Sequence, residues 1–244
     1  MATTFEKATS LRYQVAAEQR IVLRDIDWAT YQRLAEAKGD QPILLAYNRG
    51  VLEIVSPGPL HEDYKKLLGR FVESVTMELG IPCRSRGSMR WDRPEAERGL
   101  ESDECYFLTA AKVVATRHRS NNPADYPSPD LAIEVDLSPS NVDRPEIYAT
   151  IGVPEVWRID GNAVRIDYLR DDGTYEPAAE SRFLPVVPAE IAYWVLQADV
   201  DDESVWGRQL QEWVRATLLP RQRAAAAGPA MGGNASEDLG DRAE

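Results

Sequence analysis

The chain has 244 residues, of which 43% are hydrophobic, and a formal net charge of −12. This length and composition predict one folded domain with appendages, and the charge argues against a protein that coats nucleic acid non-specifically, since such coating depends on Lys and Arg. No apolar run approaches the roughly 20 residues that span a bilayer, and the first residues lack the apolar core of a secretory signal.

We therefore expect a cytoplasmic protein without a membrane segment. Cys83 and Cys105 have no CxxC spacing, so we expect reduced thiols rather than a zinc site or a disulfide. We divide the chain into an N-terminal extension (1–26), a main domain (27–200), a C-terminal helix (201–220) and a tail (221–244). The tail is rich in Ala, Gly, Arg and acidic residues, a composition that predicts disorder.

The first half of the domain predicts a helix, a hairpin and a long helix. Asp27 is suited to cap the first helix, Gly39 to end it, and Asn48-Arg49-Gly50 supplies the turn of the hairpin. The expected elements are helices over 28–38 and 60–79, strands over 43–47 and 51–55, and short strands over 81–85 and 88–91.

The second half predicts strands that alternate with helices. We expect a loop over 92–99, a strand over 102–108, a loop over 112–125, a strand from 131, a helix from 144 and a strand ending near 160. A hairpin over 163–169 and 174–177 and helices over 187–196 and 204–219 follow. This order predicts an α/β (α+β) fold with a central mixed β-sheet flanked by helices.

One strand carries an unusual acidic face. Between residues 130 and 137, apolar residues alternate with Asp130, Ala132, Glu134 and Asp136, and strand side chains point to opposite faces with a period of two. Three carboxylates on one face raise each other's pKa unless a cation lies between them. A bound magnesium ion would remove that repulsion, and a half-exposed strand whose polar face meets water is the open alternative.

A second carboxylate and a cation could join this strand. Asp103 begins another predicted strand, and if the two strands are neighbours, Asp103 and Glu134 could share one magnesium ion, which prefers oxygen ligands. Arg144 opens the helix that follows, with Tyr148 one turn later, so its side chain could lie along the face that packs on the sheet. A surface arginine paired with acidic neighbours is the alternative.

Three separated motifs carry a family resemblance. They are Leu52-Glu53-Ile54-Val55-Ser56-Pro57 followed by His61, then Gly99-Leu100-Glu101-Ser102-Asp103, and then Arg144, Tyr148 and Gly152 followed by Val153-Pro154-Glu155-Val156-Trp157. With these motifs the chain resembles the Uma-two family of restriction endonucleases, a branch of the PD-(D/E)XK nuclease superfamily, over roughly residues 27–200.

The resemblance implies a restriction-endonuclease-like core and a site that holds Mg²⁺ or Mn²⁺. It places the motif aspartate on Asp103 and the second acid on Glu134 as metal ligands. Arg144 matches the family's lysine, and Asp136 fills the ordinary third-motif position. Because arginine stays charged, it cannot act as general base, so a metal-bound water with Asp136 or Asp130 as a further ligand or proton acceptor is the expected route.

Two accessory residues, His61 and Glu53, each allow two interpretations. His61 could contact a phosphate or simply begin a helix, and Glu53 could be a third acidic ligand or a carboxylate on the hairpin face. Tyr148 is a further accessory candidate. We expect Asp130 to begin its strand and cap the adjacent turn rather than bind metal.

The resulting hypothesis is a magnesium-dependent DNA endonuclease that hydrolyses phosphodiester bonds. The alternative is a catalytically weakened nuclease fold that binds a nucleic-acid or protein partner. A homodimer would suit cleavage of both DNA strands. DNA contacts are expected from local basic side chains that flank the site: Arg84, Arg86, Arg90, Arg93, Arg117 and Arg119.

Overall fold

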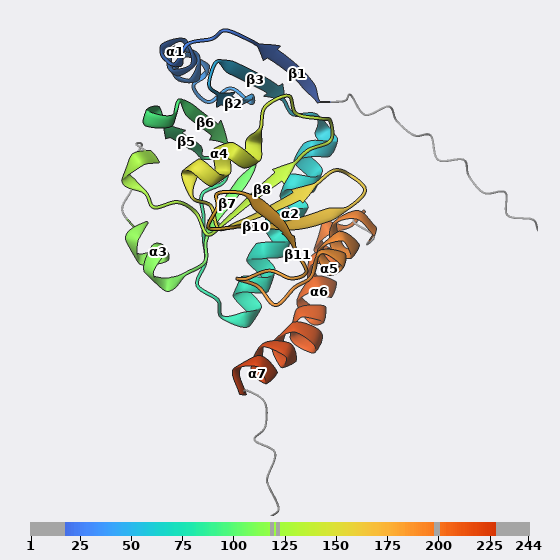
Figure 1. The fold of residues 1–244 in the computed structure, drawn as a ribbon. Coiled ribbons are helices and arrows are strands. Elements are labelled where there is room, and N and C mark those ends of the chain that lie inside the picture. The colour runs from blue at the N-terminus through green and yellow to red at the C-terminus, as the bar shows by residue number, and fades with distance from the viewer. Residues whose placement is uncertain (1–17, 118–119, 121–122, 198–200, 228–244) are drawn as a thin grey trace, which may run out of the picture.

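The computed structural model describes residues 18–117, 120, 123–197 and 201–227 (Figure 1). The helices are α1 Trp28–Lys38, α2 Pro59–Leu79, α3 Ala110–Ala115, α4 Arg144–Ile151, α5 Pro188–Ala192, α6 Glu203–Trp213 and α7 Leu219–Ala227, with 3₁₀ turns at Pro94–Ala96 and Pro123–Asp125 and π-helical turns at Tyr193–Gln197 and Val214–Leu218. The strands are β1 Gln19–Leu23, β2 Leu44–Asn48, β3 Val51–Ser56, β4 Arg84–Ser85, β5 Arg90–Arg93, β6 Arg98–Glu101, β7 Glu104–Phe107, β8 Leu131–Val135, β9 Glu155–Ile159, β10 Val164–Leu169 and β11 Tyr175–Ala178. No helix within the described ranges is long and apolar enough to cross a membrane.

The larger sheet has six strands in the order β11-β10-β9-β8-β7-β4. β8 and β9 run parallel, with α4 as the crossover between them, whereas the other neighbours are antiparallel. The odd residues of β8 join the core that α2 and the C-terminal helices form on one face, and Ala132 joins a second core with α4 on the other face. This mixed sheet with flanking helices confirms the predicted fold class.

The smaller sheet is antiparallel and has the order β1-β3-β2-β6-β5. Arg49 and Gly50 both have positive φ, which matches the two-residue turns whose twist suits a hairpin between β2 and β3. α1 covers one face of this sheet, and the opposite face packs on α4 (Figure 1). The first turn of α4 is thereby brought close to both sheets.

Two expected loops contain regular structure. Residues 92–99 contribute to β5 and β6, which pair so that the buried Trp91 and Leu100 lie opposite each other. A Cβ at Gly99 would overlap the Tyr31 hydroxyl and would lie 2.5 Å from the Asp92 carboxylate, so only glycine fits here. The expected loop over 112–125 overlaps α3, which ends at Ala115. Short strands and helices without strong periodicity explain both errors.

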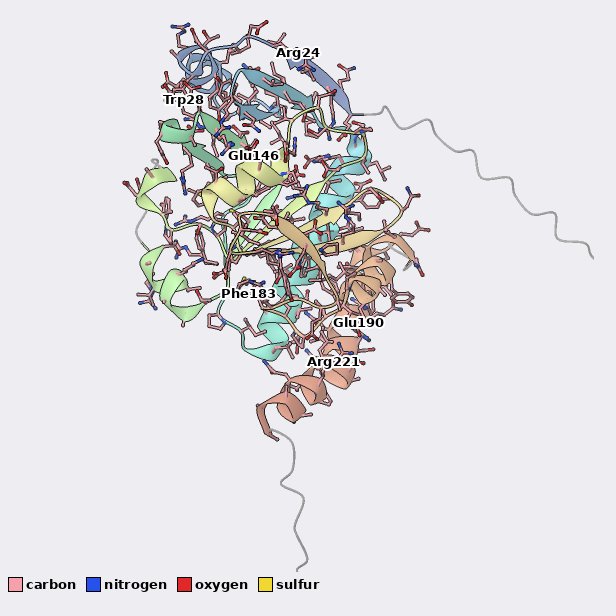
Figure 2. All side chains as sticks on the ribbon, in the orientation of Figure 1. Arg24, Trp28, Glu146, Phe183, Glu190 and Arg221 are labelled. Atoms are coloured by element: carbon pink, nitrogen blue, oxygen red, sulfur yellow. The ribbon has the colours of Figure 1, made fainter. Side chains whose placement is uncertain are left out.

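The two ends of the domain extend further than predicted. β1 lies within the stretch assigned to an N-terminal extension, yet it pairs with β3 along its whole length. At the other end, α7 continues to Ala227, and the Arg221 guanidinium bonds the Glu190 carboxylate of α5 at 2.8 Å (Figure 2). The helix therefore reaches into the stretch expected to be disordered, and residues 228–244 lie outside the described residues.

Candidate active site

Glu134 is fully buried on the face of β8 that α4 covers. Every residue of β8 is buried, so the half-exposed strand considered from the sequence is wrong. An ionised carboxylate at such a position needs charged or hydrogen-bonding partners, because removal from water strongly disfavours the charged form. The surroundings of Glu134 supply both.

Asp103 lies across from Glu134 on the neighbouring strand. β7 and β8 pair with Glu104 opposite Ile133, so the next step of this antiparallel register sets Asp103 opposite Glu134. The Asp103 Oδ2 accepts a hydrogen bond from the Val135 backbone N–H at 2.7 Å, and the side chain is fully buried. The structure thus brings together the two carboxylates expected to share a metal ion.

Two side chains of α4 bind Glu134 directly. The Arg144 guanidinium donates to Glu134 Oε2, and the Tyr148 hydroxyl donates to Oε1. Asp143 caps the helix by accepting from the Glu146 backbone N–H, which fixes Arg144 at the first helical position. The alternative of a surface Arg144 is therefore wrong.

Burial raises the pKa of Glu134 and the Asp103 and Asp136 charges add to this shift, while Arg144 opposes it. Burial also raises the pKa of the Tyr148 phenol, as does the charge of Glu134. Tyr148 consequently stays protonated and acts as a hydrogen-bond donor.

Glu53 of β3 lies on the other side of Arg144. Its Oε1 accepts from the Arg20 guanidinium at 2.9 Å and lies 3.4 Å from Arg144 Nη2, and its Oε2 accepts from the Asn141 backbone N–H at 3.0 Å. Ser140 adds a further hydrogen bond at 2.8 Å. Glu53 is fully buried, so it belongs to the same cluster as Glu134 and is not a carboxylate on an exposed hairpin face.

His61, in the first turn of α2, joins Asp103 to Glu18. Its Nε2 lies 2.8 Å from Asp103 Oδ1 and its Nδ1 lies 3.1 Å from Glu18 Oε2. Burial lowers the pKa of His61, but its hydrogen bonds to the two carboxylates outweigh burial and raise the pKa to about 9. At neutral pH the ring is an imidazolium that donates from both nitrogens.

Glu18 and Arg20 were missed by the sequence reasoning. Glu18 accepts from the Ser138 hydroxyl at 2.5 Å, and Arg20 donates to Ser138 at 2.7 Å. Burial acts to raise the pKa of Glu18, yet its hydrogen bonds from His61, Ser138 and Arg20 lower it to about 2. Opposite charges two residues apart at the start of a short strand were the available signal, because residues at that spacing in extended chain share one face.

Asp136 and Asp130 have different surroundings. One oxygen of Asp136 is buried without a hydrogen-bond partner in the described chain, and Arg20 lies 3.6 Å from it. Asp130, at the start of β8, accepts from the Leu108 and Thr109 backbone N–H groups at 2.8 Å. Asp130 thus caps the adjacent turn, as expected, and lies outside the cluster.

The donor chemistry of the cluster fits a hard divalent cation. Three cationic side chains, Arg20, Arg144 and His61, face five carboxylates, which, counted as ionised, leave a formal surplus of two negative charges. The five carboxylates are those of Glu18, Glu53, Asp103, Glu134 and Asp136. Carboxylate oxygens are the ligands that magnesium prefers. However, every oxygen of Asp103 and Glu134 already accepts a hydrogen bond, and no group of three His, Cys, Asp or Glu side chains in the described ranges is arranged to hold a metal ion.

The basic side chains expected to meet DNA have internal contacts in several cases. Arg86 donates to the Thr116 carbonyl at 2.7 Å, Arg90 lies 3.1 Å from the Asp92 carboxylate, and Arg93 donates to the Asp92 and Ile151 carbonyls. Arg119 lies outside the described residues. These contacts show that part of the basic cluster stabilises the fold.

The family model described as "Putative restriction endonuclease" (Uma2) matches residues 28–201. The chain belongs to the Uma2 family. None of the curated proteins matches this chain. A putative nuclease of the DUF820 group from Anabaena variabilis is 17% identical, and the match covers 78% of this chain and 99% of the other with a TM-score of 0.43. Glu18 and Arg20 precede the part of the chain that the Uma2 model matches.

Proposed function

We propose that this protein is a metal-dependent endonuclease that hydrolyses phosphodiester bonds in DNA. The observation that carries the proposal is the buried cluster in which Asp103 and Glu134, from adjacent strands, meet Glu53 and Arg144 with a surplus of negative charge. Membership of the Uma2 family supports it. Asp103 and Glu134 are the proposed ligands of Mg²⁺ or Mn²⁺, which would lower the pKa of a bound water and polarise the phosphate.

The protein's own groups would divide the remaining work. Arg144 remains cationic and is suited to stabilise charge on the scissile phosphate, but it competes with any cation for the Glu134 carboxylate. Asp136 is the proposed proton acceptor, because one of its oxygens has no hydrogen-bond partner in the described chain. His61 and Glu18 position Asp103, and Tyr148 positions Glu134.

The direct test is cleavage of supercoiled plasmid in magnesium by the wild type and by the nearly isosteric variants Asp103→Asn and Glu134→Gln. We expect nicked and linear products from the wild type and a loss of at least a hundredfold in each variant. The exposed Asp171→Asn variant serves as the matched control and should cleave normally. Equal cleavage by all four proteins would refute the proposed metal ligands.

A second function is favoured by one specific observation, the saturation of Asp103 and Glu134 by protein donors. This arrangement suits a weakened nuclease fold that binds nucleic acid or a protein partner. Calorimetric titration separates the two proposals, since a nuclease should bind magnesium with an affinity that falls in Asp103→Asn. A homodimer stays a prediction, and light scattering of the purified protein would test it.

A further inference from the structure

A cavity of about 390 Å³ opens beside the carboxylate cluster. The loop after β8, the start of α4, β9 and the β9–β10 turn surround it, and the lining includes Asp136, Ser138, Ser140, Arg144, Arg158 and Asn162. Two proposed catalytic side chains, Asp136 and Arg144, thus line the same space as Arg158, a residue for which the sequence analysis proposes no role. The cavity is large enough for part of a nucleotide.

The β8–β9 register directs Arg158 to this cavity. β8 and β9 are parallel with Glu134 beside Arg158, so the two side chains project from the same face of the sheet on adjacent strands. Arg158 is 8% exposed, and its Nε donates to Asp167 Oδ2 at 3.1 Å. A charged side chain that is more than nine-tenths buried therefore lies next to the catalytic carboxylates.

The ion pair with Asp167 leaves one donor nitrogen of the Arg158 guanidinium without a partner among the described residues. Nη2 of Arg158 is buried and has no hydrogen-bond partner in the described chain, and the same holds for Nε of Arg144. A buried donor without a partner is destabilising, so buried donors normally have one. Arg144 and Arg158 both line the cavity, and a ligand that enters it with acceptor oxygens would satisfy these donors.

A phosphate group matches these donors in charge and shape. The planar arginine fork binds phosphate oxygens through parallel, charge-assisted hydrogen bonds. Asp136 and Asp160 also line the cavity and balance the two arginines, so an anion should bind best when a divalent cation offsets the nearby carboxylates. A phosphate beside a metal-bearing carboxylate site satisfies both conditions.

We propose that Arg158, together with Arg144, binds the scissile phosphate of the DNA. This inference rests on the proposed nuclease function and adds a substrate-binding residue to it. The competing explanation is that water molecules alone occupy the cavity and satisfy the free donors.

Binding of a fluorescein-labelled DNA duplex, measured by anisotropy in calcium between 50 and 200 mM salt, tests the proposal. The test variant is Arg158→Met/Asp167→Asn, which keeps the net charge and leaves no unpaired carboxylate. Its control is Asp167→Asn, which retains Arg158. We expect the double variant to bind about tenfold more weakly, with a salt slope lower by about one, whereas the control binds like the wild type.

An unchanged affinity and salt slope in the double variant would overturn the inference and indicate water alone. Absence of DNA binding by the wild type would overturn it as well. If the double variant does not fold, Arg158→Lys takes its place; it keeps the charge but loses the fork, and several-fold weaker binding is expected, while wild-type binding overturns the proposal.

The same proteins incubated with plasmid and magnesium separate this inference from the proposed function. Binding that depends on Arg158 in a protein that never cleaves would refute the nuclease and retain the phosphate site. Cleavage that is indifferent to Arg158 would retain the nuclease and refute the phosphate site.

Discussion

Arg144→Met should destabilise the protein strongly, and magnesium should restore part of the loss. The substitution removes the guanidinium that bonds Glu134 and lies near Glu53, and it leaves both carboxylates buried. Removing one partner of a buried ion pair costs about 3–5 kcal/mol. At about 2–4 °C per kcal/mol for a domain of this size, the melting temperature should fall by roughly 6–20 °C.

Thermal unfolding with and without magnesium is the assay. Because Arg144 no longer competes for Glu134, the variant should bind the cation more tightly, and each tenfold gain in affinity adds about 1.4 kcal/mol of stabilisation. The magnesium-induced rise in melting temperature should therefore be larger in Arg144→Met than in the wild type. Arg170→Met is the matched control, since Arg170 also lies near two carboxylates, Asp172 and Glu176, but is exposed, so it should change stability by less than about 1 kcal/mol. The same magnesium response in all three proteins would refute the competition between Arg144 and the cation.

Three further predictions concern stability. The pKa of His61 is about 9 in the folded protein against an ordinary value near 6.5. The protonated ring therefore stabilises the fold fully below about pH 6.5, and this stabilisation is lost as the pH rises through 9. In urea unfolding between pH 6 and 10, the free energy of unfolding should fall by about 3 kcal/mol more in the wild type than in His61→Asn. Gly99→Ala should destabilise the protein by about 1–3 kcal/mol, because a Cβ would overlap the Tyr31 hydroxyl. Gly207→Ala in α6 meets open space and should stabilise the protein by about 0.5–1 kcal/mol. Equal melting temperatures for the two variants would contradict this prediction. Asp130→Ala should lower stability by about 2–4 kcal/mol through lost hydrogen bonds to Leu108 and Thr109 but leave the magnesium affinity in calorimetry unchanged; a weakened affinity would place Asp130 in the metal site.

The parts of the site that the sequence could predict are local in the chain. Glu134, Arg144 and Tyr148 lie on one strand and the helix that follows it, so alternation and helical spacing place them on facing surfaces. Asp103 begins a separate predicted strand and matches the family's first motif, but only the pairing of β7 with β8 sets it opposite Glu134. Strand pairing between distant segments has no comparable signature in a single sequence.

The contribution of β1 shows this limit. Glu18 and Arg20 reach Ser138 from about half the chain away, and only the β1–β3 pairing and the loop after β8 bring them together. Their short strand has exposed apolar residues such as Ile21, so its hydrophobic pattern does not reveal a buried partner. Charged residues at a strand end are common on protein surfaces, and burial is what gives these two their importance.

The position of Arg144 explains why an arginine suits this place, where the family resemblance leads us to expect a lysine. Its guanidinium lies between Glu134 and Glu53, and a planar fork can address two carboxylates at once, whereas a lysine ammonium is a compact point charge. Arg20 approaches Glu53 from the β1 side, so the cluster is stabilised by two arginines that bridge four of its carboxylates. The arginine is therefore matched to its partners, and Arg144→Lys alone would leave Glu53 with one bridging cation fewer instead of recreating a lysine-based site.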